Sequence, residues 1–490
     1  MMERMTDPAS DLDPGSDPDL TAQTVELLRE LIRNACVSDG SPDSGGEARN
    51  AASIARFLEG AGIELELVEP HPGRVSLIAT LRGAGVGADG DAGARGAAPA
   101  DADAPPAAPS LLLLGHTDVV PPGHGWAHDP FGAELVDGEI WGRGALDMLH
   151  LTAAYAVVIR TLAREAAAGA RLHGTLVFAA VADEESGGRY GAKWILENRP
   201  ELVDDGRLVG VLSETGGIPL ATTGADGRSA VRGVTVTVGE KGMSARRLRF
   251  AGHPRHASTP WGADNAIVTA AAAVSRIAEH AGAAEIDDLW PQYVDVLDVP
   301  DDVRAALVDP ARIDAALSRL GPIAGLAHAV THTTYSPDVA RGGDKLNVVP
   351  QSAHVDLDIR TLPGVTGADV DAHLRDALGP LADRVVIEPL GDESPASRSP
   401  TEGPLFEALA EAVASAYPGA RAVPVIAPGG ADSRFFRHRG IPAYGFGMFS
   451  PRWRHADFRH LVHSVDERID VDSVALAVRA VERVVRRVLG

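Results

Sequence analysis

The sequence contains very little cysteine and very little lysine. Cys36 is the one cysteine among 490 residues, so no disulfide can form within the chain. Structural disulfides are rare in reducing compartments, which fits a chain with one cysteine, and we therefore expect a cytoplasmic protein. Lysine occurs only at Lys193, Lys241 and Lys345, and arginine supplies almost all of the positive charge. We interpret this imbalance as a bias of genome composition rather than as a functional feature.

Long apolar runs and an excess of positive charge are also absent. No stretch approaches the roughly 20 apolar residues that cross a membrane. Residues 1–20 are acidic and proline-rich, unlike the basic and then apolar start of a secretory signal. The 68 acidic residues outnumber the 45 lysines and arginines, which gives a formal net charge of −23. Such a charge repels nucleic acids and anionic membrane surfaces, so we expect neither as a partner.

The length and the hydrophobic content of the chain indicate two domains. A chain of 490 residues is too long for one ordinary core, and 45% hydrophobic residues are enough to bury a large one. Residues 1–20 are expected to form a disordered tail. Residues 83–110 consist almost entirely of Gly, Ala, Pro and Asp. Because this composition buries little apolar surface, we expect a flexible insert between two strands there.

The first half of the chain has the pattern of an α/β fold, a mixed sheet flanked by helices. Continuous apolar runs at Leu111–Leu114 and Leu176–Val181 are typical of central parallel strands that are covered on both faces. The stretch Leu149–Ala168 between them has the apolar spacing of a helix. This succession predicts right-handed crossovers between the strands. Closer to the N-terminus, two helices and then two strands are expected at residues 25–35, 47–58, 63–68 and 74–81.

A different pattern begins near residue 242 and ends near residue 395. It fits an α+β domain, with strands expected at 247–251, 346–349 and 355–359 and helices at 263–281 and 367–378. Within it, residues 283–340 are acidic and contain five prolines, which indicates an irregular insertion. Alternation of helix and strand then resumes, with segments at 405–416, 422–426, 441–446 and 471–489. The simplest arrangement is a domain of residues 21–241 and 396–490 that is interrupted by a second domain of residues 242–395.

Acidic and histidine side chains recur where strand-like stretches run into loops. Carboxylate oxygens and imidazole nitrogens are ligands of Zn²⁺ and similar divalent cations, and an additional carboxylate beside them makes a hydrolytic site. Ligand sites of α/β sheets lie at the carboxyl ends of strands, where several of these residues fall. The candidates are His116, Asp118, Asp147, Glu184, Glu185, Glu214 and His463.

Each of these pieces has an ordinary structural alternative. His116 and Asp118 are two residues apart, so on extended backbone they share a face, and Asp118 can orient a metal-ligating His116. A histidine and an aspartate at this spacing are also common without a metal. Asp147 precedes a helix and could simply cap it. Glu184 and Glu185 could form a solvated loop; after a central strand, however, one can ligate a metal while the other accepts a proton from water.

In combination, these motifs resemble a known enzyme family. GHTDVVP at residues 115–121, GRGxxDM at 142–148 and DEESGG at 183–188 are similar to motifs of the zinc aminoacylase family. That family of co-catalytic metallopeptidases includes acetylornithine deacetylase, succinyl-diaminopimelate desuccinylase, aminoacylase and glutamate carboxypeptidase. The resemblance extends from about Thr21 to Gly490. It implies a zinc-exopeptidase-like fold whose inserted domain acts as a lid and dimerisation domain.

The resemblance also implies a role for each candidate. Two Zn²⁺ ions, with Co²⁺ or Mn²⁺ as substitutes, are bridged by Asp147. His116 and Glu214 complete one metal site, and Glu185 and His463 complete the other. Glu184 is the general base, and Asp118 supports His116.

Three segments outside the ligand set resemble parts of the family's substrate site. GHPRHAS at residues 252–258 implies that His256 stabilises the oxyanion, in relatives often across a dimer interface. DIRTLPG at 358–364 implies that Arg360 holds a substrate carboxylate, for which the alternative is an ion pair with Asp356 or Asp358. Asn347, Gly430 and Asp432, the last two in GGADSR at 429–434, are expected to contact substrate. Leu149-His150 and Thr215 depart from the family pattern.

We therefore expect a metal-dependent hydrolase that cleaves an amide bond next to a free carboxylate, as a carboxypeptidase or dipeptidase. The alternative within the enzyme class is deacylation of an N-acyl amino acid by an aminoacylase, deacetylase or desuccinylase. The alternative of another class is a non-catalytic binding protein on the same fold, which would be expected to lack Glu184 or a ligand. The expected partners are a small peptide or N-acyl amino acid and a second copy of the chain, bound through the lid. A nucleophile elbow and a phosphate-binding loop are both missing from the sequence.

Overall fold

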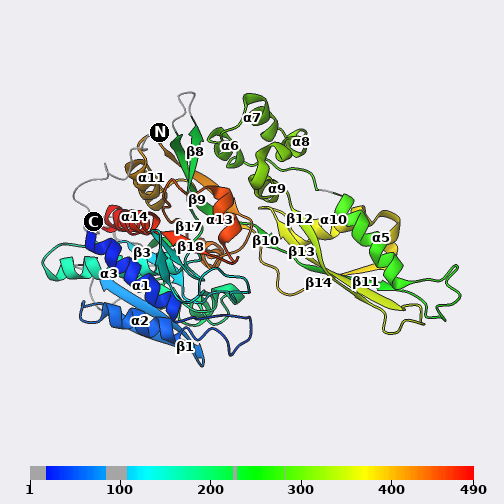
Figure 1. Ribbon diagram of the computed structural model, residues 1–490, viewed down its shortest axis with the longest axis horizontal. Helices are drawn as coiled ribbons and strands as arrows, with labels where there is room; N and C mark the ends of the chain where they lie inside the picture. The colour runs from blue at the N-terminus through cyan, green and yellow to red at the C-terminus, as the bar shows by residue number, and fades with distance from the viewer. Residues whose placement is uncertain (1–17, 84–107, 224–228, 281) are drawn as a thin grey trace, which may run out of the picture.

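The computed structural model describes residues 18–83, 108–223, 229–280 and 282–490. It contains a large α/β body and a smaller sheet with two helices, which extends from one side of the body (Figure 1). Most of the predicted N-terminal tail and of the predicted insert at 83–110 lies outside the described residues. Residues 18–20 were expected in the tail, but they begin the first helix, where the buried Leu20 packs into the main core.

The body is built on a ten-stranded mixed sheet with the order β1-β2-β6-β3-β7-β17-β9-β15, in which β8 and β16 also pair with β9. Strand β3 runs parallel to β6 and β7, so the predicted central parallel strands are confirmed. Strand β1 lies at the edge and pairs antiparallel with β2. The bounds are β1 Glu64–His71, β2 Arg74–Arg82, β3 Ser110–His116, β6 Thr175–Val181, β7 Leu208–Ser213, β8 Gly216–Thr223, β9 Ser229–Glu240, β15 Ser397–Arg398, β16 Arg421–Ala427 and β17 Ala443–Gly445.

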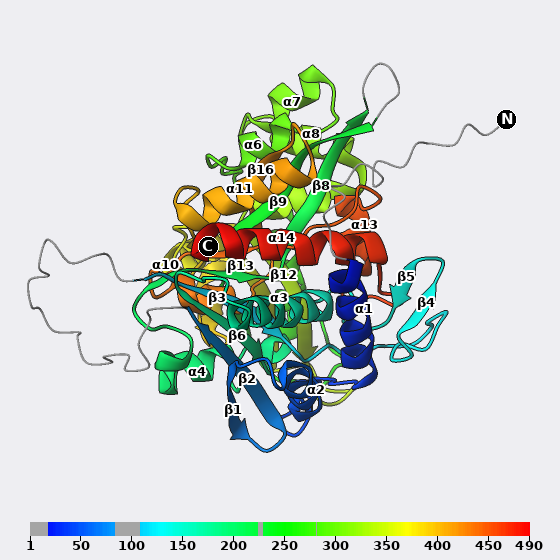
Figure 2. The ribbon, with the colours of Figure 1, turned by 90° about the vertical axis from the view of Figure 1, so that its left-hand side faces the viewer.

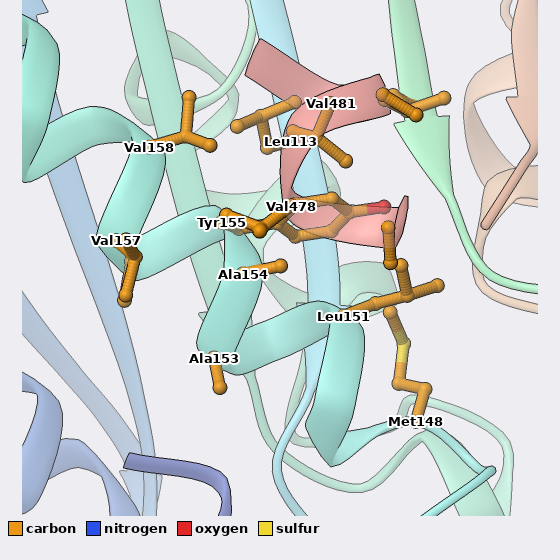
Figure 3. Close-up of a cluster of buried hydrophobic side chains, with 14 of the residues drawn as sticks. Leu113, Met148, Leu151, Ala153, Ala154, Tyr155, Val157, Val158, Val478 and Val481 are labelled. Atoms are coloured by element: carbon orange, nitrogen blue, oxygen red, sulfur yellow. The ribbon is translucent and has the colours of Figure 1, made fainter. Parts of the chain in front are cut away.

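Helices cover both faces of this sheet. The side chains of β3 alternate between two cores: Leu111 and Leu113 face one, and Leu112 and Leu114 face the other. On the first face, α3 and α14 lie side by side over the sheet, with Tyr155 between them (Figures 2 and 3). The helices of the body are α1 Pro18–Arg33, α2 Ala48–Leu58, α3 Leu149–Ala167, α4 Ala192–Asn198, α11 Pro404–Ala416, α12 Ser433–Arg437, α13 His455–Leu461 and α14 Val471–Leu489. A small sheet at the rim joins β4 Glu134–Val136, β5 Glu139–Trp141 and β18 Arg468–Asp470.

The second large sheet is antiparallel and has its own core. Its order is β10-β13-β11-β14, and β12 pairs with the other side of β13. Helices α5 and α10 pack on one face of it around residues such as Leu248 and Leu374. The bounds are β10 Gly242–Met243, β11 Arg246–Ala251, β12 Thr334–Gly342, β13 Ser352–Thr361, β14 Val385–Pro389, α5 Ala266–Glu279 and α10 Gly367–Leu378.

Two expectations for this region were wrong. Residues 283–340 are not irregular, since they form four short helices and strand β12. Two of their five prolines mark helix starts: Pro291 is in the first turn of α6, and Pro300 directly precedes α7. Residues 346–349 form a turn rather than a strand, because Leu346 is fully exposed and only Val348 bridges to another segment. The helices are α6 Trp290–Asp295, α7 Asp301–Leu307, α8 Ile313–Leu317 and α9 Ala324–Thr331.

The four short helices belong to the body by packing. Trp290 and Val294 of α6 share a hydrophobic core with Leu220 of β8 and Val423 of β16. The group therefore covers the far end of the large sheet, above the second sheet in Figure 1. None of the helices in the described ranges combines the length and the apolar character needed to cross a bilayer.

Buried ion pairs connect segments that are distant in sequence. Arg143 and Glu467 are both buried and lie 2.5 Å apart, which ties the C-terminal part of the chain to the loop before α3. Arg74 of β2 is also buried and pairs with Glu47 at 2.8 Å and with Asp183 at 2.7 Å. Removing one member of such a pair leaves an uncompensated charge in the interior, which costs far more than loss of an exposed pair.

Glu467→Ala is expected to lower the free energy of unfolding by about 3–5 kcal/mol, because it leaves the Arg143 guanidinium buried and unpaired. The matched control is Glu411→Ala, which breaks the exposed pair with Arg487 and should cost less than about 1 kcal/mol. Urea denaturation of both variants measures the difference. Equal effects of the two substitutions would show that the buried pair does not hold these segments together.

Candidate active site

The predicted metal ligands gather at the carboxyl edge of the large sheet. His116 is the last residue of β3, Glu184 and Glu185 lie in a short turn after β6, and Glu214 directly follows β7. Because β6, β3 and β7 are adjacent and parallel, their carboxyl ends place these side chains next to one another.

Asp147 lies at the centre of the group, between two histidines. Its Oδ1 is 3.2 Å from Nε2 of His116, and its Oδ2 is 3.1 Å from Nε2 of His463. Nε2 of His116 is also 3.7 Å from Oε2 of Glu214, and Nε2 of His463 is 3.2 Å from Oε2 of Glu185. The five side chains thus form two halves that share one carboxylate.

Asp118 supports the site mainly through the turn that carries the two glutamates. Its Oδ1 accepts a hydrogen bond from the Glu184 N–H at 3.1 Å, and its Oδ2 accepts one from the Glu185 N–H at 3.2 Å. Nδ1 of His116 lies 2.9 Å from the backbone carbonyl oxygen of Asp118 and 3.7 Å from its carboxylate. A histidine whose Nδ1–H donates to that carbonyl presents Nε2 to a metal.

Two further supports were not predicted from the sequence. Oε1 of Glu467 accepts hydrogen bonds from the N–H groups of Leu146 at 2.8 Å and Asp147 at 3.1 Å, which fixes the backbone that carries the central carboxylate. Asp183, held by Arg74, accepts from the Tyr190 N–H at 2.9 Å and closes the turn around Glu184. Glu467 stands beside Asp466 four residues after His463, and only its tertiary contacts reveal its role.

The cluster carries more negative charge than its own groups can balance. Burial opposes a charge on His116, yet Glu214 and Asp147 outweigh it and raise the pKa of His116 well above its usual range. Burial and the adjacent Asp147 raise the pKa of Glu214 to about 8. Burial, with Glu214 next to it, also raises the pKa of Glu184 well above the usual value for a carboxyl. Hydrogen bonds to Asp147 and Glu185 raise the pKa of His463 to about 10.

These residues fit divalent cations. Ligand atoms of His116, Glu184 and Glu214 lie within 4.8 Å of one another, and so do those of His116, Asp147 and Glu185. Imidazole nitrogens and carboxylate oxygens are suitable donors, and a cation would take the place of the protons that otherwise reduce the repulsion.

A cleft between the body and the second sheet opens onto the cluster. Lys241 and Arg360 line it opposite the predicted ligands, together with Gly430 from the loop before α12. Burial and the neighbouring Arg360 lower the pKa of Lys241 to about 7. Lys241 was not predicted, and no motif in the sequence marks it. Its Nζ donates to the His332 carbonyl at 2.7 Å.

Arg360 lines the cleft and also forms an ion pair with Asp358, which was the alternative to a role in substrate binding. Its Nε and Nη2 donate to the two carboxylate oxygens of Asp358 at 2.7 and 2.8 Å. Its side chain is 34% exposed, so a second anion can still approach it from the cleft.

Asp432 does not line the cleft. It is 2% exposed, burial raises its pKa to about 6, and its charge contributes to the raised pKa of Glu184. Within the described chain, neither oxygen of Asp432 has a hydrogen-bond partner. Its position is thus behind Glu184 rather than on the substrate side.

The structure does not bring His256 and Asn347 to the cluster. Both are exposed on the second sheet's far loops, where His256 bridges to Val348, and neither lines the cleft. Nδ1 of His256 lies 2.6 Å from the Ser258 hydroxyl. Trp261 is 94% exposed and Leu346 is 100% exposed on the same two loops, so large apolar side chains face solvent on the loops that carry His256 and Asn347.

Comparison with known proteins identifies the family. Residues 112–487 match the model described as peptidase family M20/M25/M40. The chain is 26% identical over 470 residues to the succinyl-diaminopimelate desuccinylase of Acidiphilium cryptum (strain JF-5), which covers 95% of this chain and 99% of that protein. Its fold is similar to that of an M20 family metallo-carboxypeptidase from Sulfolobus solfataricus, with a TM-score of 0.63, 19% identity and coverage of 96% and 99%.

Human carnosine dipeptidase 1 has a similar fold as well, with a TM-score of 0.62 and 16% identity over 96% of each chain. The family match spans most of the chain and includes the cluster from Asp147 to His463. The chain therefore belongs to peptidase family M20/M25/M40, and it is a metal-dependent hydrolase of amide bonds.

Proposed function

We propose that the enzyme cleaves an amide bond next to a free carboxylate, as a carboxypeptidase or dipeptidase, and that it uses two Zn²⁺ ions. Co²⁺ or Mn²⁺ would serve as substitutes. The observation that carries the proposal is the position of Asp147, whose two oxygens face two separate histidines. A shared carboxylate between two sets of donors suits a pair of cations.

His116 and Glu214 would hold one cation, Glu185 and His463 the other, and Asp147 both. When bound, the cations polarise the scissile carbonyl and lower the pKa of the attacking water. Glu467 keeps the backbone of Asp147 in place, and Asp118 keeps that of Glu184 and Glu185.

Glu184 would transfer the proton. Its carboxyl is half-buried in the cleft beside Glu214, and the raised pKa makes it a better proton acceptor than an ordinary carboxylate. Water oxygen bonds to the amide carbon as Glu184 takes a proton, and Glu184 returns that proton to the nitrogen as the C–N bond breaks. The products are an amine and a carboxylate.

Arg360 and Lys241 would bind the substrate carboxylate from the opposite wall. Both line the cleft, and Arg360 is close enough to lower the pKa of Lys241. An anion placed between them relieves that repulsion, and Arg360 offers a planar fork matched to a carboxylate. Gly430 would contact substrate in the same cleft, whereas Asp432 would act by placing charge behind Glu184.

Deacylation of an N-acyl amino acid is the second candidate function. It uses the same chemistry and the same carboxylate clamp, and differs only in the group on the acyl side of the bond. Relatives named succinyl-diaminopimelate desuccinylase favour it. A non-catalytic binding protein is disfavoured because Glu184 and every predicted ligand are present.

We also propose a homodimer in which the predicted inserted domain of residues 242–395, without the four short helices that pack on the body, acts as a lid and dimerisation domain. The support is the position of His256, which is exposed and does not line its own cleft, and the exposure of Trp261 and Leu346 on the same two loops. A second copy that covers these apolar side chains would receive His256, with Asn347 beside it, as an oxyanion donor. A cytoplasmic location is part of the proposal and rests on the single cysteine.

Glu184→Gln is expected to keep the metal content near that of the wild type and to lower kcat by about 10²–10⁴-fold, because it removes the proton acceptor and no predicted ligand. Elemental analysis and turnover of a panel of dipeptides and N-acetyl amino acids, with zinc, cobalt and manganese, test the proposed function. Wild-type turnover by the variant would contradict the mechanism.

Arg360→Lys should raise KM for free-acid substrates about tenfold, because a lysine cannot form the bidentate pair, and should leave carboxamide substrates unaffected. Arg247→Lys is a matched control, since Arg247 binds Asp356 through the same two-bond geometry in the same sheet but outside the cleft. Unchanged KM for free acids in Arg360→Lys would leave Arg360 as a structural partner of Asp358.

Co-expression of Glu184→Gln and His256→Ala subunits tests whether His256 acts across a dimer. Each variant alone should be nearly inactive, whereas a random mixture should regain about a quarter of the wild-type activity, because half of the dimers are hybrids with one complete site. The control mixture combines the double variant Glu184→Gln/His256→Ala with the single variant Glu184→Gln. This mixture should regain no activity. Failure of the first mixture, with hybrid dimers isolated by two affinity tags, would show that His256 does not act across a dimer.

A further inference from the structure

The balance of charge in the metal cleft is opposite to that of the chain as a whole. The chain has 45 lysines and arginines against 68 acidic residues. Among the residues that line the cleft outside the cluster of predicted metal ligands and Glu184, however, seven are basic and three are acidic. Positive charge concentrated in one cleft of an acidic protein indicates a negatively charged ligand. The basic residues are Arg189, Lys193, Lys241, Arg360, Arg434, Arg439 and Arg459, and the acidic ones are Glu197, Asp392 and Glu393.

One end of this positive charge is at the proposed carboxylate clamp on the second sheet. Arg360 of β13 pairs with Met243 of β10, and Met243 forms a bridge with Ser394. Ser394 lies on the segment that returns from the second sheet to the body. All three residues line the cleft, so its wall continues from Arg360 across the connection between the two sheets.

The positive charge continues onto the body through α12. The Pro395 carbonyl oxygen lies 3.0 Å from Nε2 of His438, and His438 is followed by Arg439. Arg434 is in the first turn of α12, and its guanidinium lies 4.4 Å from the centre of the Phe435 ring. Helix α12 in turn contacts α4, which forms the next part of the wall.

Helix α4 and the loop before it carry the other end of the positive charge. Lys193 is in the first turn of α4, and Arg189 lies three residues after the turn of Glu184–Ser186. A side chain at Gly188 would collide with the ring of Phe435, so this loop is in contact with α12. The positive charge therefore ends beside Glu184, the proposed proton acceptor. The four cations on the body, Arg189, Lys193, Arg434 and Arg439, are called the basic strip below.

The protein itself does not neutralise the basic strip. Two of the four cations are exposed and two are half-buried. Within the described part of the chain, none of them forms a hydrogen bond or an ion pair. Arg437, which is also on α12, is by contrast buried and paired with Glu240. Unpaired cations on the wall of a cleft keep their hydrogen-bond donors for an anion from outside.

The acidic residues of the cleft reduce this positive charge only in part. Glu393 is already engaged, since its Oε1 lies 2.8 Å from the Arg246 guanidinium and 2.9 Å from the Ser244 hydroxyl. Glu197 and Asp392 are exposed. Four cations less these two carboxylates leave the strip with an excess of two positive charges.

The cleft has space for more than a single amino acid. Its volume is about 1060 Å³, at the upper limit of the roughly 300–1,000 Å³ that is typical of small-molecule sites. The positive charge begins at Arg360 and ends beside Glu184. With the substrate carboxylate on Arg360 and the scissile amide over the cluster, the residues on the acyl side of the bond can extend along the basic strip.

We propose that the basic strip binds acidic side chains on the acyl side of the scissile bond, and that the preferred substrates are peptides with two or more acidic residues before the C-terminal residue. The inference rests on the proposed function, because it takes the orientation of the substrate from the carboxylate clamp. Water adds across the C–N bond, and the products are one amino acid and a peptide that is shorter by one residue and keeps its acidic side chains.

A short acidic peptide fits these observations better than other anions do. A single acyl carboxylate can engage only part of a strip that extends over α4 and α12. A long polyanion such as a nucleic acid would meet the negative charge of the rest of the chain, whose net value is −23. A peptide of a few residues lies within the cleft and meets mainly its positive wall.

The first test varies the charge of peptides of constant length with leucine as the residue released. For the metal-loaded wild type, kcat/KM should rise from Ac-Ala-Ala-Leu to Ac-Ala-Glu-Leu and again to Ac-Glu-Glu-Leu, by about two- to fivefold for each glutamate, as one exposed ion pair provides. Ac-Gln-Gln-Leu is the uncharged control of equal size. Equal kcat/KM for the glutamate and glutamine peptides would overturn the proposal. So would a gain of succinyl-Leu over Ac-Leu that the second glutamate does not increase.

The second test removes charge from the basic strip. Lys193→Gln/Arg439→Gln should lower the ratio of kcat/KM for Ac-Glu-Glu-Leu to that for Ac-Gln-Gln-Leu at least about fourfold, because each lost cation removes one ion pair. The matched control is Arg479→Gln/Arg483→Gln on α14. One of these arginines is half-buried and one is exposed, neither lines the cleft, and neither has an ion pair in the described chain. The control should keep the ratio within about twofold of the wild type, and an unchanged ratio in the strip variant would refute the assignment.

The outcomes separate this inference from the proposed function. Cleavage of neutral peptides with no gain from glutamate would leave the proposed function standing and remove the role of the basic strip. If no amide is cleaved, the proposed function fails, and calorimetric titration with Ac-Glu-Glu-Leu and Ac-Gln-Gln-Leu decides the inference. Tighter binding of the acidic peptide by the wild type, lost in Lys193→Gln/Arg439→Gln, would support it, and equal affinities would overturn it.

Discussion

Repulsion among clustered carboxylates is the constraint on which the rest of the structure depends. Asp147, Glu184, Glu185 and Glu214 meet in a space where few opposite charges belong to the protein itself. The raised pKa of Glu214 and of His116 both express this excess of negative charge. Cations remove it, so the same crowding that destabilises the empty cluster gives the site its affinity for metal and gives Glu184 its basicity.

The fold holds these groups together through supports outside the site. The carboxyl ends of three parallel strands supply the positions, and the buried ion pairs of Arg74 and Arg143 lock the loops that follow. The backbone is strained at the same places: Asp183, Thr215 and His463 have φ values of 68°, 63° and 61°. For a β-branched residue such as Thr215 this conformation is unusual, and packing of the surrounding chain must compensate for it.

The sequence predicted the parts of the fold that depend on local pattern. Apolar runs such as Leu111–Leu114 identified the central strands, and the acidic residues after them identified the edge of the sheet where the site lies. Tertiary contacts could not be predicted from the sequence. No local sequence pattern marks Glu467 as the support of Asp147, or Lys241 as part of the wall opposite the cluster. Residues 283–340 were misinterpreted because prolines at helix starts were taken for breaks in irregular chain.

The arrangement separates chemistry from selectivity. The strand ends that carry the cluster belong to the central sheet, and any shift there would change the distances between charged groups. Arg360 stands instead on the second sheet, which has its own hydrophobic core beside the body. Side chains of that sheet that line the cleft can therefore vary with little effect on the positions of Glu184 and Asp147. Substrate range can change through the second sheet while the hydrolytic centre stays as it is.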